Sequence, residues 1–225
     1  MSEPLPNFRE EQSAKIPALT LLTNLGYQFI PPEECLTMRG RLSSVILPTV
    51  LRDVLKHKTY LFMGKEHNLS DAGIDKIIQT LATPAMNAGL KAANEKLYNA
   101  MTHGITVTEF IDGKKANPTI QVIDWETPEN NQFHFTEEME IDNTHSTGKR
   151  IPDIVCFVNG LPWVVIEAKR PDSSHEGKPT VAEGISQNIR NQKVDEIPHL
   201  FAYSQLLLSV NGNEGLYATC GTDSK

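Results

Sequence analysis

Three charged residues in the second half of the chain have the types and spacing needed for metal-assisted chemistry on a phosphate. Asp153 stands directly before one apolar run, and Glu167 and Lys169 lie at the end of the next one. If the two runs are paired strands, Asp153 lies nearly opposite Glu167, and Lys169 projects from the same face two residues further on. Carboxylates that share apolar surroundings are unfavourable unless they are paired or bind a cation.

A divalent cation would account for this arrangement, because two carboxylates and a main-chain carbonyl suit Mg²⁺. A lysine beside such an ion is placed to orient or deprotonate a metal-bound water, which is the chemistry of phosphodiester hydrolysis. The same short pattern also fits a structural interpretation, in which Glu167 pairs with Lys169 or Arg170 and Asp153 caps a turn. These residues taken alone leave both interpretations open.

A β-hairpin is the element that would bring the three residues together. Residues 154–158 and 161–169 are two apolar runs, and Asn159-Gly160 between them is the strongest short signal for a two-residue hairpin turn. Both runs are apolar at successive positions rather than at alternate ones. We therefore expect a sheet that is covered on both faces.

The remaining sequence predicts helices first and mainly strands later, as a single domain over 1–225 that is mainly helical in 1–102 and sheet-rich in 103–225. Pro17 is expected to end or kink a turn of the first helix, and Asp112-Gly113 is expected to form a turn between strands. Helical spacing of apolar residues predicts helices over 8–25, 47–55, 70–81, 86–101, 180–192 and 197–203. Strands are expected over 106–110, 119–124, 133–136, 206–210 and 216–220. The fold class predicted is mixed α/β.

Composition excludes several classes of protein. The 225 residues are 39% hydrophobic and 22% charged, which is typical of a globular domain. No apolar run is long enough to span a bilayer, and the first residues lack the order of a signal peptide. The three cysteines are far apart and form no CxxC pair, which argues against a disulfide framework or structural zinc and favours a reducing cytoplasm.

The net charge of −7, taken as one number, argues against a DNA-binding protein, but this charge is localised. Residues 103–148 account for −7, whereas residues 149–193 hold seven basic and five acidic groups. Because this region carries little net positive charge, we expect the domain on its own to bind DNA with low affinity. The candidate phosphate contacts, each of which also fits a solvated surface charge, are Lys149, Arg150, Arg170 and Arg190.

A longer motif makes the functional interpretation more specific. The run RIPDIVCFVNGLPWVVIEAKRP (150–171) resembles the nuclease core of the restriction (R) subunit of type I restriction–modification enzymes, a branch of the PD-(D/E)xK nucleases. Further segments resemble the same family in the same order: LGYQF (25–29), IDWETPENNQFHF (123–135) and IPHLFAYSQLLLSVNG (197–212). The resemblance thus covers nearly the whole chain.

This resemblance implies a fold, an activity and a set of site residues. The fold is a restriction-endonuclease-like core with a mixed central sheet flanked by helices and helical N-terminal additions, and the activity is Mg²⁺-dependent cleavage of double-stranded DNA. By position, Asp153 and Glu167 would be metal ligands together with the carbonyl of Ala168, and Lys169 would serve the attacking water. Gln187 would act from the following helix, where it could orient the lysine or a phosphate.

One position departs from the family pattern. The family often carries Q-x-x-x-Y on that helix, but here Asn191 stands in the place of the tyrosine. Related nucleases sometimes supply another carboxylate from the first helix, where Glu10 and Glu11 lie. Acidic residues at a helix N-terminus also occur because they interact favourably with the helix dipole.

The resemblance also implies partners. No GxxxxGK[ST] phosphate loop exists in the chain, so ATP would be used by a motor beyond residue 225. Methylase and specificity subunits would complete the complex. Two alternatives remain: a docking module with a nuclease fold and negligible activity, or a stand-alone repair or recombination nuclease.

Overall fold

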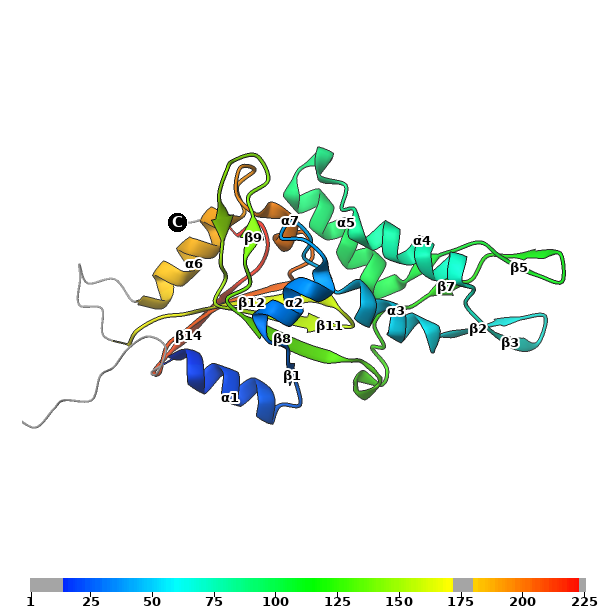
Figure 1. The fold of residues 1–225 in the computed structure, drawn as a ribbon, viewed down its shortest axis with the longest axis horizontal. Helices are drawn as coiled ribbons and strands as arrows, with labels where there is room; N and C mark the ends of the chain where they lie inside the picture. Colours follow the sequence, from blue (N-terminus) through cyan, green and yellow to red (C-terminus); the bar gives the residue numbers. More distant parts are fainter. Residues whose placement is uncertain (1–13, 172–179, 223–225) are drawn as a thin grey trace, which may run out of the picture.

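The computed structural model describes residues 14–171 and 180–222. Its centre is a six-stranded sheet in the order β1-β8-β11-β12-β13-β14 (Figure 1). The strands are β1 (Gln28–Phe29), β8 (Phe133–Glu137), β11 (Ile154–Val158), β12 (Leu161–Ala168), β13 (Leu206–Val210) and β14 (Gly215–Ala218). Because helices pack around this sheet, the expected mixed α/β fold is confirmed.

The sheet is mixed in direction. The β1–β8 and β12–β13 pairs are parallel, whereas β8–β11, β11–β12 and β13–β14 are antiparallel. A parallel pair needs a crossover connection, and the chain between β12 and β13 includes two helices, α6 (Thr180–Asn191) and α7 (Pro198–Phe201). This crossover lays α6 against the strand that carries Glu167.

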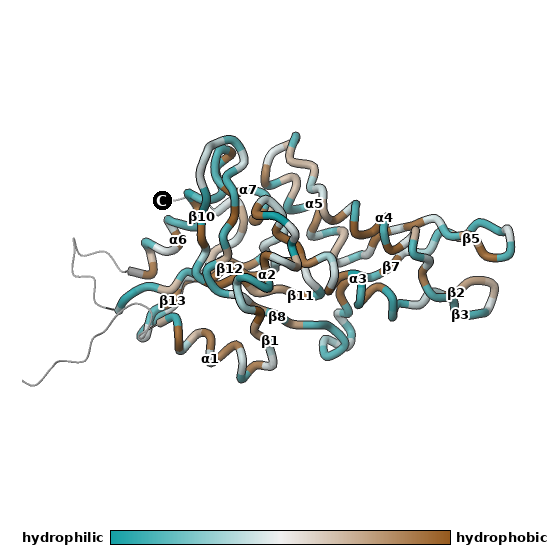
Figure 2. The backbone as a smooth tube through the Cα atoms, in the orientation of Figure 1, coloured by the Kyte–Doolittle hydropathy of each residue, from teal (hydrophilic) through white to brown (hydrophobic). Residues whose placement is uncertain are grey.

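The other helices lie N-terminal to the hairpin. They are α1 (Ile16–Asn24), α2 (Pro32–Arg39), α3 (Pro48–Lys56), α4 (Asp71–Ala82) and α5 (Leu90–His103), with short 3₁₀ turns η2 (Met86–Ala88) and η3 (Pro128–Asn130). Figure 2 shows hydrophobic and hydrophilic residues alternating along α1 and α3, as expected for helices that bury one face. None of the helices in the described ranges is both long and apolar enough to cross a membrane.

Both faces of the central sheet are covered, as the apolar strands predict. On one face, Leu22 of α1 packs with Ile154 and Ile166. On the other, Val155 and Val165 belong to the larger core, to which α3, α4, α5 and α7 also contribute. The two clusters hold the β11–β12 hairpin between them.

The β11–β12 hairpin has the predicted two-residue turn. Asn159 and Gly160 have φ values of 51° and 81°, the left-handed conformation that such a turn requires. A Cβ at Gly160 would lie 2.6 Å from the carbonyl oxygen of Leu47, so no other residue fits there. Ile154 is opposite Ile166 in the ladder. The next residues outward, Asp153 and Glu167, are therefore brought to the open end of the hairpin.

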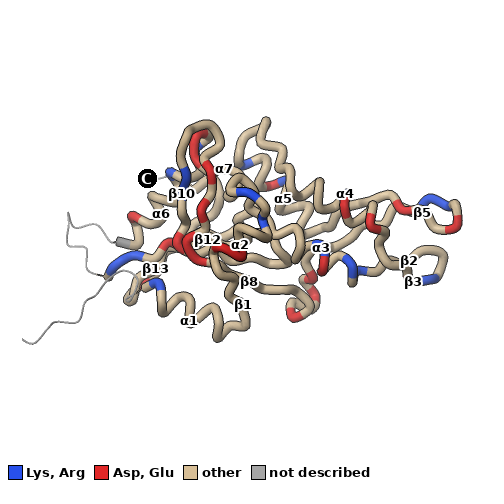
Figure 3. Tube along the Cα trace, viewed as in Figure 1, with Lys and Arg blue, Asp and Glu red and all other residues tan. Residues whose placement is uncertain are grey.

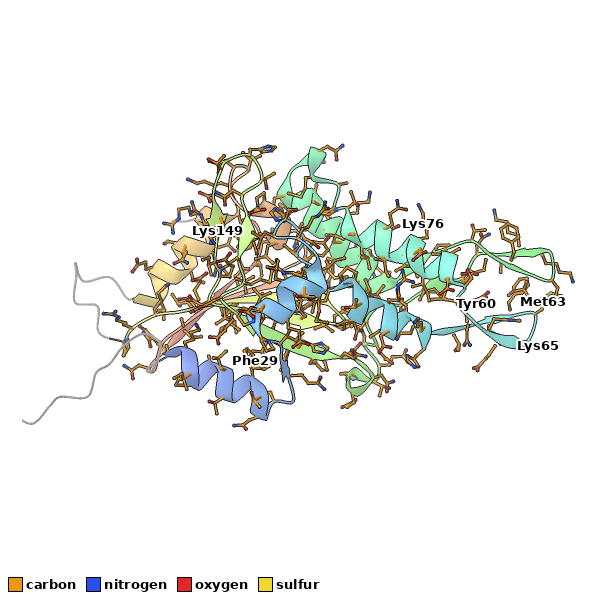
Figure 4. All side chains as sticks on the ribbon, in the orientation of Figure 1. Phe29, Tyr60, Met63, Lys65, Lys76 and Lys149 are labelled. Atoms are coloured by element: carbon orange, nitrogen blue, oxygen red, sulfur yellow. The ribbon has the colours of Figure 1, made fainter. Side chains whose placement is uncertain are left out.

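Four shorter strand pairs lie outside the central sheet. They are β2 (Thr59–Phe62) with β3 (Lys65–Asn68), β4 (Ile105–Thr106) with β7 (Thr119–Ile120), β5 (Glu109–Ile111) with β6 (Lys114–Ala116), and β9 (Ile141–Asp142) with β10 (Lys149–Arg150). The predicted Asp112-Gly113 turn is confirmed as the tip of β5–β6, but the strands beside it are not the expected pair. The expected strand over 119–124 is reduced to β7, which pairs with β4, and β6 was not predicted. The β2–β3 tip, marked by Met63 and Lys65 in Figure 4, lies at the end of the molecule away from α6.

The structure refines two expectations about helices. Pro17 lies in the first turn of α1, directly after the π-helical residues Ala14 and Lys15, so the helix type changes where the sequence predicted that a turn would end or kink. Residues 8–13 of the expected helix lie outside the described residues. The expected helix over 86–101 is divided at Gly89, whose φ of 89° interrupts the helix between η2 and α5.

Candidate active site

The open end of the hairpin gathers the three charged residues that the sequence singled out. The main-chain N–H of Ala168 donates a hydrogen bond of 2.8 Å to Asp153 Oδ2, which joins the start of one strand to the end of the other. Lys169 Nζ lies 3.5 Å from Glu167 Oε2 and 4.0 Å from Asp153 Oδ2. Figure 3 shows acidic and basic segments meeting at this end of the sheet.

Gln187 reaches the same cluster from α6. Its Nε2 donates a 2.7 Å hydrogen bond to Glu167 Oε2, and its Oε1 accepts a 3.1 Å hydrogen bond from Lys169 Nζ. One side-chain amide therefore contacts both the carboxylate and the ammonium. The four side chains predicted to be catalytic thus lie together, although they come from the two hairpin strands and a helix.

Burial makes Glu167 the unusual member of this group. Its side chain is 0% exposed, whereas that of Asp153 is 28% exposed. Burial, followed by the nearby Asp153 carboxylate, raises the pKa of Glu167 to about 8, and Lys169 opposes this shift. Glu167 Oε1 is buried and has no hydrogen-bond partner among the described residues. In its neutral form the Glu167 carboxyl can share a hydrogen bond with Asp153, whereas its charged form needs a further positive partner.

The donor set fits a hard divalent cation. Nowhere in residues 14–171 and 180–222 do three or more His, Cys, Asp or Glu side chains form a metal-holding group. The available ligands would be the Asp153 and Glu167 carboxylates and the Ala168 carbonyl, all of them oxygens, as Mg²⁺ prefers. The buried oxygen of Glu167 fits such a ligand set. The assignment of Mg²⁺ itself stays a prediction.

A lysine that sequence reasoning missed lies beside the site. Lys15, just before α1, pairs with Glu137 at 2.7 Å and with Glu138 at 2.6 Å. The Glu138 N–H in turn donates a 2.9 Å hydrogen bond to the carbonyl of Asp153. Lys15 thus neutralises the acidic end of β8 next to the candidate ligand. The partners are 123 residues apart, so no local sequence signal could have identified them.

The four candidate phosphate contacts fall into two groups. Lys149 pairs with Glu140 at 2.7 Å, and Arg150 pairs with Glu196 at 2.5 Å. Both belong to β10, from which Lys149 projects in Figure 4. Arg170 and Arg190 are exposed, one directly after Lys169 and the other on α6. Their contact with DNA stays a prediction.

The buried face of α6 differs from the expected one. Val181, Ile185 and Ile189 have the spacing of an apolar helix stripe, but Ile185 and Ile189 are only partly buried. Gly184, Asn188 and Asn191 are buried instead, together with Val181. Asn191, in the place of the family tyrosine, is thus a core residue, and its carbonyl accepts a 3.1 Å hydrogen bond from Ile197 N–H.

Other candidates lie apart from this cluster. Glu10 and Glu11 are outside the described residues. His134 is buried in β8 opposite Phe157, so it is the sheet residue that its apolar neighbours predict. A pocket of about 810 Å³, lined by His145 and His199 among others, contains none of the predicted site residues.

Comparison with known proteins agrees with the resemblance. Residues 7–225 match the family described as the type I restriction enzyme R protein N terminus. The type I restriction enzyme HindI endonuclease subunit of Haemophilus influenzae is 30% identical over 204 residues, which cover 88% of this chain and 18% of that protein. A Methanocaldococcus jannaschii protein, named as the type I restriction enzyme MjaIXP endonuclease subunit, is 24% identical over 226 residues, covering 99% of this chain and 20% of that protein.

The chain therefore spans about a fifth of the length of these curated relatives. The match to the family includes the β11–β12 hairpin, α6 and the acidic residues 103–148. With 219 of its 225 positions inside the matched range, the chain belongs to the family of type I restriction enzyme R protein N-terminal regions.

Proposed function

We propose that this chain is the DNA-cleaving region of a type I restriction endonuclease subunit and that it hydrolyses phosphodiester bonds of double-stranded DNA with Mg²⁺. The observation that carries the proposal is the contact of Gln187 with both Glu167 and Lys169 at the open end of the hairpin. An ion pair serving stability alone would not need an amide that contacts both charges, nor a carboxylate oxygen buried without a partner among the described residues.

Each residue has a distinct role in this proposal. Asp153, Glu167 and the carbonyl of Ala168 would hold the cation, which supplies charge neutralisation at the scissile phosphate. Lys169 Nζ would orient the attacking water and accept or relay its proton. Gln187 would keep that nitrogen beside the carboxylates, because its Oε1 accepts the lysine's hydrogen bond. Cleavage then depends on holding these groups in one geometry.

The setting of this reaction is also a proposal. The relatives are named as subunits and are about five times as long as the matched part. We propose that an ATP-driven motor outside these residues delivers the DNA, and that methylase and specificity subunits complete a cytoplasmic complex. The nearly balanced charge of residues 149–193 supports delivery by another part of the enzyme, since such a region binds phosphate weakly by itself.

The test compares plasmid cleavage by the assembled enzyme and by Asp153→Ala and Lys169→Ala variants, with Mg²⁺ or Mn²⁺. We expect losses of about 100-fold or more, because a metal ligand or the water-orienting lysine is removed. Lys76→Ala, an exposed residue of α4 (Figure 4), is the control and should cleave normally. Circular dichroism checks the fold of each variant.

Unchanged cleavage by both variants would overturn the assignment of the site. If the wild-type assembly cleaves no DNA with any divalent ion, the docking module becomes the better description. Cleavage that needs no ATP and no partner would instead favour the stand-alone nuclease.

A further inference from the structure

We infer that Gly184 is a positioning residue, and that the missing side chain at this position lets α6 approach β12 and β13 closely enough for Gln187 to contact Glu167 and Lys169. The inference deepens the proposed function and rests on it for its catalytic consequence. The structural part stands on the packing of α6 alone.

A glycine inside α6 is unfavourable on local grounds. The helix runs from Thr180 to Asn191, so Gly184 lies in its interior. Glycine costs about 1 kcal/mol relative to alanine at such a position. Its presence therefore points to a packing requirement rather than to helix propensity.

The packing requirement is visible around the glycine. A Cβ at position 184 would lie 2.8 Å from the Cβ of Ser209 and 3.2 Å from the Cβ of Glu167, and it would overlap the Ser209 hydroxyl. The hydroxyl could rotate away, but the two Cβ atoms are fixed by the backbone of the strands. An alanine at this position would therefore force α6 and the sheet apart.

That close approach occurs at the active-site strand itself. Glu167 and Ser209 are paired across β12 and β13, and both contact points for Gly184 belong to this pair. Gln187 lies three residues after Gly184, which places the two on neighbouring turns of one helix face. The same Glu167 thus contacts Gly184 through its Cβ and Gln187 through its carboxylate.

A small outward shift of α6 would therefore act on the site directly. The hydrogen bonds of Gln187 are 2.7 Å to Glu167 and 3.1 Å from Lys169. Hydrogen bonds of this kind span about 2.7–3.2 Å and also depend on the N–H···O angle, so displacement by a few tenths of an ångström would take the Lys169 bond beyond this range and lengthen the bond to Glu167. Gly184→Ala is expected to reproduce the defect of Gln187→Ala while leaving every side chain of the candidate site in place.

Cleavage at saturating Mg²⁺ tests this in the assembled enzyme. We expect Gly184→Ala to lower the turnover rate at least tenfold, close to the effect of Gln187→Ala. The Gly184→Ala/Gln187→Ala double variant should be no worse than Gln187→Ala, because both changes remove one interaction. Gly215→Ala is the matched control, since a Cβ there meets only ordinary contacts at 3.6 and 3.7 Å.

Rescue tests whether contact with Ser209 causes the loss. Ser209→Gly removes the Cβ and the hydroxyl that an alanine at 184 would meet. The Gly184→Ala/Ser209→Gly double variant should therefore recover most of the activity of Ser209→Gly alone. If the losses of the two single changes add instead, contact with Ser209 is not the cause.

A second readout does not depend on cleavage. In this chain the side-chain amide of Gln187 is hydrogen-bonded and should exchange slowly with solvent in NMR spectra. Exchange of this amide should accelerate in Gly184→Ala and slow again in Gly184→Ala/Ser209→Gly. If Gly184→Ala does not fold, the Gly184→Ala/Ser209→Gly variant decides: a protected Gln187 amide supports the inference, and an exposed one overturns it.

Two results would overturn the inference outright: normal cleavage with a protected Gln187 amide in Gly184→Ala, or losses that add in the Gly184→Ala/Gln187→Ala variant. A wild-type enzyme that does not cleave DNA would contradict the proposed function. In that case the exchange of the Gln187 amide would still decide the role of Gly184.

Discussion

Asn159 and Asn131 are joined by a 2.8 Å hydrogen bond from Nδ2 of the first to Oδ1 of the second, inside the protein. Asn159 also donates to the carbonyl of Val122 and accepts a 2.7 Å hydrogen bond from the Gln132 N–H. Asn131 in turn donates to the carbonyl of Asp124. These hydrogen bonds fix the turn of the β11–β12 hairpin to residues 122–132, which precede it in the sequence. We call this network the asparagine lock.

Removing this lock should destabilise the fold. In Asn159→Ala, the Val122 carbonyl and the Gln132 N–H lose their side-chain partner, and an alanine must adopt the φ of 51°. Buried groups left unpaired cost about 1–3 kcal/mol each, so we expect the free energy of unfolding to fall by about 2–4 kcal/mol. Urea denaturation measures this change. Asn130→Ala, which removes one exposed hydrogen bond to Asp124, should cost less than about 1 kcal/mol. Equal losses for the two variants would contradict the lock.

The turn of the hairpin was predictable because its determinants are local. An Asn-Gly pair between apolar runs specifies the turn, but the pairing shifts by one residue between Cys156 and Phe157, and this bulge brings Asp153 opposite Glu167. Gln187 followed from the family resemblance rather than from periodicity. The sequence therefore predicted which side chains would meet, although their roles stay predictions.

Features set by distant contacts were not predictable. Gly184 and Asn188 lie on the buried face of α6 because β12 and β13 pass beneath it, whereas the apolar pattern favoured Ile185 and Ile189. Leu21 and Leu25, apolar residues at helical spacing in the expected helix over 8–25, are 58% and 65% exposed. Hydrophobic spacing indicates that a helix is amphipathic, but tertiary packing decides which neighbouring row is covered.

Glu167 predicts a pH dependence of stability. Its pKa is about 8 in the folded chain, above the ordinary value of 4.5, so the folded state retains a proton that the unfolded state loses between these values. Stability should therefore fall as the pH rises from about 4.5 to 8. Glu167→Gln cannot titrate, and without metal we expect it to melt several degrees higher than wild type at pH 8 but not at pH 4.5. Thermal melts in EDTA measure this.

Mg²⁺ provides the control for this effect. The ion favours the charged carboxylate, so it should raise the melting temperature of wild type at pH 8 and leave Glu167→Gln nearly unchanged. A wild-type protein that gains stability over Glu167→Gln as the pH rises in EDTA would contradict the assigned pKa direction.

Lys15 should contribute more to the stability of the fold than an ordinary surface charge does. Its side chain is 9% exposed and lies between Glu137 and Glu138, so Lys15→Met leaves two neighbouring carboxylates without their cation. We expect the free energy of unfolding to fall by about 2–3 kcal/mol. Arg52→Met, which breaks the exposed pair with Asp75, should cost about 0–1 kcal/mol. Urea denaturation measures the free energy of unfolding of both variants. A larger loss in Arg52→Met than in Lys15→Met would disprove this ranking.

Three of the four candidate phosphate contacts should differ in how much they contribute to DNA binding. Arg170 and Arg190 are exposed, whereas Lys149 pairs with Glu140. Arg170→Ala and Arg190→Ala should each weaken binding and reduce the slope of log affinity against log salt by about 0.9, because one phosphate contact and its released counterion are lost. Lys149→Ala should change the slope less, since that lysine's charge is already partly neutralised by Glu140. Binding of the assembled enzyme to duplex DNA in EDTA, across a range of salt concentrations, measures the slopes without cleavage. If Lys149→Ala lowered the slope as much as the two arginine variants, DNA would have to displace Glu140, and the contact surface would extend along the β9–β10 hairpin.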